Sequence, residues 1–148
     1  KPFHTEVIGF SRTGSNGSKK ISELDALLPT FDVVILITPL TDETRHLMDA
    51  RRLALMTDGA TLINVARGPV VDTDALVHEL NSGRISAGVD VTDPEPLPAD
   101  HPLWKCPNLL ISPHVGGNSA AFVPRGHQLI TDQLIRISQG EPLINIVR

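Results

Sequence analysis

The stretch Asp32-Val33-Val34-Ile35-Leu36-Ile37-Thr38 decides the fold. Its unbroken apolar run is rich in β-branched residues and predicts a strand that is covered on both faces, as in a parallel sheet. Similar runs occupy residues 60–65, 85–91 and 109–112, and helical patterns at 42–57 and 72–80 lie between them. This alternation predicts a parallel sheet with helices on both faces.

The flanks of this stretch complete the predicted layout. Residues 6–10 are typical of a short strand, residues 22–28 of a short helix that ends before Pro29, and residues 118–139 of a long closing helix. A dinucleotide-binding sheet opens with a strand and a G-x-G-x-x-G turn that binds the pyrophosphate, and no such motif precedes Glu6. We therefore expect an α/β fold: a Rossmann-like, doubly wound parallel sheet that lacks its first strand and glycine-rich loop. Residues 1–117 would form the C-terminal part of a dinucleotide-binding domain, and residues 118–148 the closing helix and a tail that returns toward a substrate domain.

Composition excludes several classes of protein. The 148 residues suit about one domain, and the net charge of −4 comes with scattered Lys and Arg residues, which is unlike a nucleic-acid or membrane surface. The longest apolar run, Val33 to Ile37, is too short to span a bilayer. A single cysteine, Cys106, excludes an intramolecular disulfide and favours a reducing, cytoplasmic location.

Three chemically active side chains follow predicted strands, where ligands of α/β proteins bind. Arg67 follows the run at 60–65, and its planar guanidinium has two parallel donors that suit a carboxylate. His114 follows the run at 109–112, and an imidazole can give or take a proton near neutral pH. Glu95 lies between two prolines, and a carboxylate beside His114 would favour imidazolium and orient the ring.

Each of these residues also has an ordinary structural interpretation. Arg67 could pair on the surface with Asp72 or Asp74, and His114 could bond to backbone at the end of a strand. Asp93 and Asp100 compete with Glu95 for its role on chemistry alone. No Cys/His cluster or helical i, i+4 ligand pair indicates a metal site.

The stretches Asn64–Gly68, Gly88–Pro96 and Ser112–Gly117, with Asp100–Asn108 between the last two, resemble the signature of the D-isomer-specific 2-hydroxyacid dehydrogenases. The resemblance covers nearly the whole chain from Glu6. It implies that Arg67 binds the substrate carboxylate, that Glu95 tunes the histidine and that His114 is the acid/base, which demotes Asp93 and Asp100. Related formate dehydrogenases carry glutamine in place of this glutamate, so the resemblance favours a 2-keto or 2-hydroxy acid over formate.

The resemblance also implies a nicotinamide dinucleotide as cofactor. Its contacts would fall on Thr38 and Pro39, on the backbone of Val65 and Ala66, and on Asp90, Gly116 and Gly117. NAD-specific relatives usually carry an aspartate after the second strand, where this chain has Ser11-Arg12-Thr13. These residues could hold a 2′-phosphate, so NADP is predicted to be slightly preferred over NAD. The alternative is that Arg12 stacks on adenine and either cofactor works.

The sequence thus predicts a cytoplasmic oxidoreductase that transfers a hydride between NAD(P)H and a small 2-keto or D-2-hydroxy acid such as glyoxylate or hydroxypyruvate. By resemblance it would be a homodimer, with no nucleic-acid or membrane partner. One alternative is a dinucleotide-sensing, corepressor-like binding protein of the same fold. Another is an inactive fragment of the dehydrogenase that has the catalytic residues and lacks the pyrophosphate site.

Overall fold

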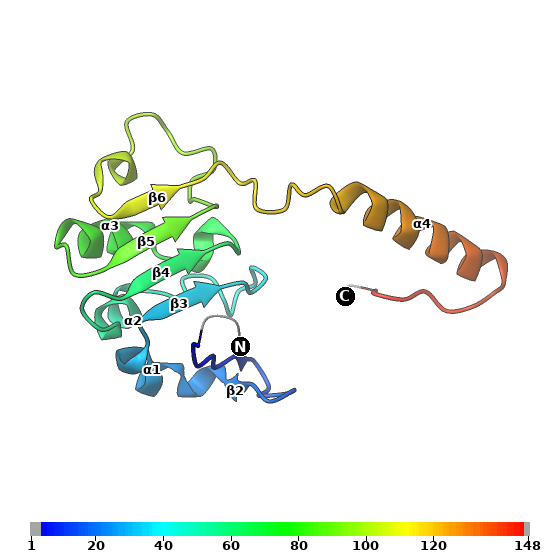
Figure 1. Ribbon diagram of the computed structural model, residues 1–148, viewed down its shortest axis with the longest axis horizontal. Helices are drawn as coiled ribbons and strands as arrows, with labels where there is room; N and C mark the ends of the chain where they lie inside the picture. Colours follow the sequence, from blue (N-terminus) through cyan, green and yellow to red (C-terminus); the bar gives the residue numbers. More distant parts are fainter. Residues whose placement is uncertain (1–3, 147–148) are drawn as a thin grey trace. The chain divides into compact units, whose positions relative to one another are not determined.

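The computed structural model describes residues 4–146, and these form two compact units (Figure 1). The first unit ends at Pro113, and the second begins at His114. The first contains the sheets and the short helices, and the second contains one long helix and its tail. None of the helices in residues 4–146 is long and apolar enough to cross a bilayer.

The main sheet of the first unit has four parallel strands in the order β3-β4-β5-β6. They are β3 (Val33–Leu36), β4 (Thr61–Asn64), β5 (Ser86–Val89) and β6 (Leu109–Ile111). Each strand lies within an apolar run that predicted it. The order of the strands in the sheet is the same as their order in the chain. Because the strands are parallel, each connection returns the chain to the same end of the sheet before the next strand begins. The parallel α/β sheet of a Rossmann-like domain is confirmed.

A second, two-stranded sheet precedes the main one. It pairs β1 (Phe10–Ser11) with β2 (Lys19–Lys20) in parallel. The predicted strand at 6–10 is thus shorter and begins later, and β2 was not expected. Its two lysines are exposed and carry no apolar signal, so only the backbone pairing defines this strand.

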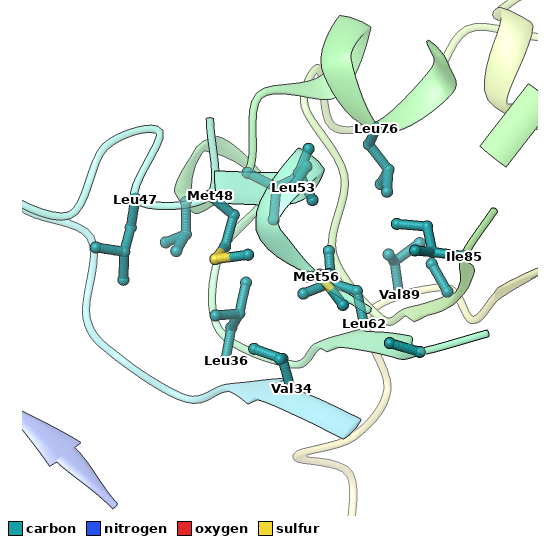
Figure 2. Close-up of a cluster of buried hydrophobic side chains, with 14 of the residues drawn as sticks. Val34, Leu36, Leu47, Met48, Leu53, Met56, Leu62, Leu76, Ile85 and Val89 are labelled. Carbon is teal, nitrogen blue, oxygen red and sulfur yellow. The ribbon is translucent and has the colours of Figure 1, made fainter. Parts of the chain in front are cut away.

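Three helices cover one face of the main sheet. They are α1 (Leu24–Leu27), α2 (Ala50–Leu55) and α3 (Thr73–Asn81). Their buried residues Leu53 and Leu76 belong to one core with Val34 and Leu62 of the strands (Figure 2). Leu53 and Leu62 are fully buried, and removing such residues from water is the main favourable term in folding.

The opposite face of the sheet is different from the sequence-based expectation. Burial alternates along β3, so that Val33 is 52% exposed and Ile35 is 59% exposed. An unbroken apolar run predicted cover on both faces, whereas the helices of residues 4–113 cover only one. The apolar run therefore identifies the strand correctly, but it does not show whether residues 4–113 cover both of its faces.

The helix predicted at 42–57 is much shorter in the structure. Only Ala50–Leu55 is helical, and Asp49 begins it by accepting a hydrogen bond from the Arg52 N–H at 2.8 Å. Before it, the Thr44 hydroxyl accepts from the Thr41 N–H at 2.8 Å, which holds residues 41–44 in a turn. Side chains of threonine and aspartate bond to nearby backbone and so compete with helix formation. By contrast, the helix at 72–80 is confirmed as α3.

The second unit contains α4 (Phe122–Ser138) and a tail that folds back along it. Gln133 exchanges two hydrogen bonds with the backbone of Ile144, and Arg136 pairs with Glu141 at 2.9 Å. The helix begins four residues later than predicted. Its large apolar side chains are exposed within this unit, including Ile130 (59%) and Leu134 (60%).

Candidate active site

The carboxyl ends of the main strands lie in register. Leu36, Asn64, Val89 and Ile111 are partners across the four strands, so the residues that follow them meet at one edge of the sheet. Thr38, Arg67 and Asp90 lie at this edge. Ligands of open α/β sheets bind at such an edge.

Asn64 holds the turn that presents Arg67. Its side chain is 1% exposed, its Oδ1 accepts from the Ala66 N–H at 3.0 Å, and its Nδ2 donates to the Arg67 carbonyl at 3.0 Å. Both polar ends of the amide are therefore satisfied by the turn. The exposed Arg67 side chain donates through Nη1 to the Ala66 carbonyl at 2.6 Å. Asp72, a surface partner considered for Arg67, instead accepts from the Ala75 N–H at the start of α3.

The loop that carries Glu95 packs against this turn. A Cβ atom on Gly68 would lie 1.9 Å from the Thr92 carbonyl oxygen, so the two backbones touch where no side chain fits. The Thr73 hydroxyl donates to the Asp93 carbonyl at 3.0 Å. Both Asp93–Pro94 and Glu95–Pro96 are cis, and Glu95 itself is exposed. The structure therefore brings the Arg67 turn and the Glu95 loop together.

Asp90 joins the ends of β5 and β6. It is 8% exposed, its carboxylate accepts a hydrogen bond from the Ser112 hydroxyl, and its N–H donates to the Asn64 carbonyl at 3.0 Å. The Ser112 N–H in turn donates to the Val89 carbonyl at 2.9 Å. A buried carboxylate with defined partners is a fixed acceptor, which suits the proposed contact with a carboxamide.

His114 opens the second unit, with Val115, Gly116 and Gly117 directly after it. Its φ is 53°, in the left-handed region that residues other than glycine seldom adopt. Unusual backbone conformations of this kind concentrate at functional sites. The pairing of His114 with Glu95 stays a prediction from the resemblance, as do the cofactor contacts of Gly116 and Gly117.

The loop after β1 carries the residues that were predicted to hold a 2′-phosphate. Ser11 Oγ lies 2.7 Å from Ser18 Oγ and accepts from the Gly14 N–H at 3.0 Å, while the Thr13 hydroxyl donates to Ser15 Oγ at 3.1 Å. These bonds order a loop rich in hydroxyl groups, and Arg12 is exposed on it. Residues 11–20 contain three cationic side chains and no carboxylate that would repel a 2′-phosphate.

The remaining candidate cofactor residues follow β3 and β4. The Pro39 carbonyl accepts from the Thr44 hydroxyl at 2.7 Å, and Thr38 is half-buried. The Val65 N–H donates to the Leu36 carbonyl at 3.2 Å, which leaves the Val65 side chain 47% exposed and buries Ala66. Whether these residues contact the cofactor stays a prediction from the resemblance.

A comparison with protein families shows where this chain belongs. The family described as "D-isomer specific 2-hydroxyacid dehydrogenase, NAD binding domain" matches residues 1–116. The chain belongs to this family. One relative is a glyoxylate/hydroxypyruvate reductase B of Citrobacter koseri. It is 44% identical to this chain over 126 residues, which are 84% of this chain and 39% of the relative. A mitochondrial formate dehydrogenase of Hordeum vulgare is 36% identical over 95% of this chain and 40% of the relative.

A solved structure shows the same fold. The D-isomer specific 2-hydroxyacid dehydrogenase from Xanthobacter autotrophicus Py2, in complex with NADPH and MES, superposes with a TM-score of 0.85 and 42% identity. The match covers 96% of this chain and 60% of the other. The chain spans about two fifths of the length of the curated relatives it matches.

Three residues that shape the site were not singled out for their roles by the sequence. Asn64 and Gly68 lie in the same short motif as Arg67, and this position could have predicted that they shape its turn. Thr73 carries no such signal, because its partner Asp93 lies 20 residues away in the chain. Only the packing of α3 against the Glu95 loop brings these two residues together.

Proposed function

We propose that the protein containing this chain transfers a hydride between a nicotinamide dinucleotide and a small 2-keto or D-2-hydroxy acid. The observation that carries the proposal is the packing of the Arg67 turn against the Glu95 loop at the carboxyl edge of the sheet. Membership of the 2-hydroxyacid dehydrogenase family supports it.

In this proposal Arg67 binds the substrate. Its exposed guanidinium grips the carboxylate with two parallel donors and stabilises the negative charge that develops on the neighbouring carbonyl oxygen. Asn64 fixes the backbone from which the guanidinium extends. A well-placed cation of this kind orients the keto carbon, and orientation accounts for a large part of the rate enhancement in many enzymes.

His114 moves the proton. A bound nicotinamide supplies the hydride to the keto carbon or accepts it in the reverse direction. His114 donates a proton to the carbonyl oxygen during reduction and accepts one from the hydroxyl during oxidation. Glu95 orients the ring and stabilises its protonated form.

The cofactor is expected to be held at both ends by this chain. Asp90, which is fixed by Ser112, would accept from the carboxamide, and Ser11, Arg12 and Thr13 would hold the phosphate of NADP. Replacing Ser11 by Asp places a carboxylate where the phosphate binds. We expect the ratio of kcat/KM for NADPH to that for NADH to fall in this variant, and an unchanged ratio would contradict the preference.

Steady-state kinetics of the full-length protein test the function. Oxidation of NADPH and of NADH is measured with glyoxylate and with hydroxypyruvate. In the reverse direction, reduction of the oxidised cofactors is measured with formate. The His114→Ala variant is expected to lose turnover while it retains dinucleotide binding. His78→Ala, in the exposed part of α3, is the matched control and is expected to behave as the wild type.

A second pair of variants tests the substrate arginine. Arg67→Lys keeps the positive charge but loses the two parallel donors. Arg67→Gln loses the positive charge as well as the two parallel donors. We expect KM for the keto acid to rise in both variants, more strongly in the second, with little change in the dissociation constant for NADPH. Tight dinucleotide binding without turnover on any keto acid would overturn the proposal and favour a dinucleotide-sensing protein.

A further inference from the structure

The first turn of α3 touches the loop that carries Glu95. Thr73 is the first residue of α3 and is half-buried, and its hydroxyl donates to the Asp93 carbonyl at 3.0 Å. The helix does not need this hydroxyl as a cap, because Asp72 already accepts from the Ala75 N–H at 3.1 Å. The Thr73 hydroxyl therefore serves a contact outside its own helix.

The Asp93 carbonyl lies in a part of the loop that makes several other contacts. On one side the Thr92 carbonyl lies against Gly68, and Gly68, Thr73, Thr92 and Asp93 line the same narrow hollow. On the other side the Thr92 hydroxyl donates to the Pro94 carbonyl at 2.9 Å. The loop is thus held at residues 92–94, directly before Glu95.

Pro94 transmits this restraint to Glu95. Its ring fixes its φ, so one backbone torsion fewer can vary between the Asp93 carbonyl and Glu95 than in an ordinary loop. A displacement of the Asp93 carbonyl is therefore passed on to Glu95 instead of being absorbed between them.

We propose that Thr73 is a positioning residue of the active site: its hydroxyl holds the Asp93 carbonyl and thereby fixes Glu95 for its work on His114. The proposal rests on the proposed function, because it assigns Thr73 an effect only through Glu95. It adds to that function a residue of α3 that acts through the backbone of the Glu95 loop.

Substitutions at Thr73 test this in the full-length protein. Thr73→Val keeps the shape and loses the donor, Thr73→Ala removes the donor in a residue that favours helix, and Thr73→Ser keeps the hydroxyl. Loss of one hydrogen bond predicts that kcat falls roughly fivefold or more in the Val and Ala variants. We expect KM for NADPH to stay unchanged and the Ser variant to recover most of the wild-type kcat. Urea unfolding of each variant shows whether the fold is retained.

A double-mutant cycle with Glu95→Gln identifies the route of the effect. If Thr73 acts through Glu95, the double variant Thr73→Val/Glu95→Gln has the same kcat as Glu95→Gln alone. Additive losses, or a Ser variant as slow as the Val variant, would overturn the role of Thr73 while leaving Glu95 in place. A Glu95→Gln variant with wild-type kcat would instead overturn the assignment of Glu95, and the proposal for Thr73 with it.

Discussion

The contact between Gly68 and Thr92 gives the sharpest prediction of stability and activity. In a Gly68→Ala variant the new Cβ atom would lie 1.9 Å from the Thr92 carbonyl oxygen and 2.2 Å from its carbon. Non-bonded heavy atoms approach to about 3.5 Å, so the two backbones would have to separate by roughly 1.5 Å. Overpacking of this kind costs about 1–3 kcal/mol, and we expect the upper part of that range because the obstacle is backbone and not a flexible side chain.

Urea unfolding and kinetics measure the two consequences. With a slope of about 2 kcal/mol per molar urea, the unfolding midpoint of Gly68→Ala is expected to fall by roughly 1 M. A displacement of about 1 Å can reduce a catalytic rate roughly a hundredfold, so kcat/KM for the keto acid is expected to fall by at least tenfold.

Gly126→Ala is the matched control for this experiment. Apart from its chain neighbours and the nearby backbone of α4 itself, no heavy atom lies within 4 Å of a Cβ atom at Gly126, which is inside α4. Replacing a helical glycine by alanine stabilises a helix by up to about 1 kcal/mol, so this variant is expected to unfold at the same or a higher urea concentration. A Gly68→Ala protein with wild-type unfolding and kcat/KM would refute the reasoning from close approach.

Three further predictions concern charged and thiol groups of the first unit. Arg84 pairs with the nearly buried Glu79 at 2.8 Å and donates to the Leu53 carbonyl at 2.6 Å, so Arg84→Met is expected to lower the free energy of unfolding by about 3 kcal/mol in a urea titration. The variant Arg84→Met/Glu79→Met should recover part of this loss, since it leaves no unpaired carboxylate, and an equal or larger loss would contradict the prediction. Hydrogen bonds from Arg52 and Arg51 lower the pKa of Asp25 below 3.8. Because the pair is partly exposed and screened, Asp25→Asn is expected to cost only about 0.5 kcal/mol at pH 7. That difference should shrink as the pH falls through the lowered pKa, and a constant difference in urea midpoint between pH 7 and pH 3 would contradict the assignment. Burial raises the pKa of the Cys106 thiol, so its reaction with a disulfide reagent at pH 8 should be slower than that of free cysteine and should accelerate in urea.

The sequence alone predicted the elements whose signal is local. The apolar runs located all four strands of the main sheet, and Asp72 with the pattern after it located α3. The same runs placed Arg67 and Asp90 after strands, and parallel pairing then brings such residues to one edge of the sheet. These predictions succeed because periodicity and capping depend on residues that are near each other in the chain.

Local signals were misleading where tertiary contacts or side-chain bonds to backbone compete with them. The pattern at 42–57 favoured a long helix, and the hydroxyl of Thr44 instead stabilises a turn before α2. The run at Val33–Ile37 predicted a strand buried on both faces, and its alternate residues are exposed in the first unit. The strand at Lys19–Lys20 gave no apolar signal at all.

The sequence by itself determined the type of sheet, the positions of its strands and the residues at its carboxyl edge. Only the tertiary structure decided that the turn of Arg67 lies against the loop of Glu95, that Gly68 permits this approach, and that Thr73 bonds to Asp93. Each of these contacts joins residues 20 or more positions apart in the chain. No local periodicity encodes them, because they arise only when α3 and the loop after β5 are packed on the same sheet.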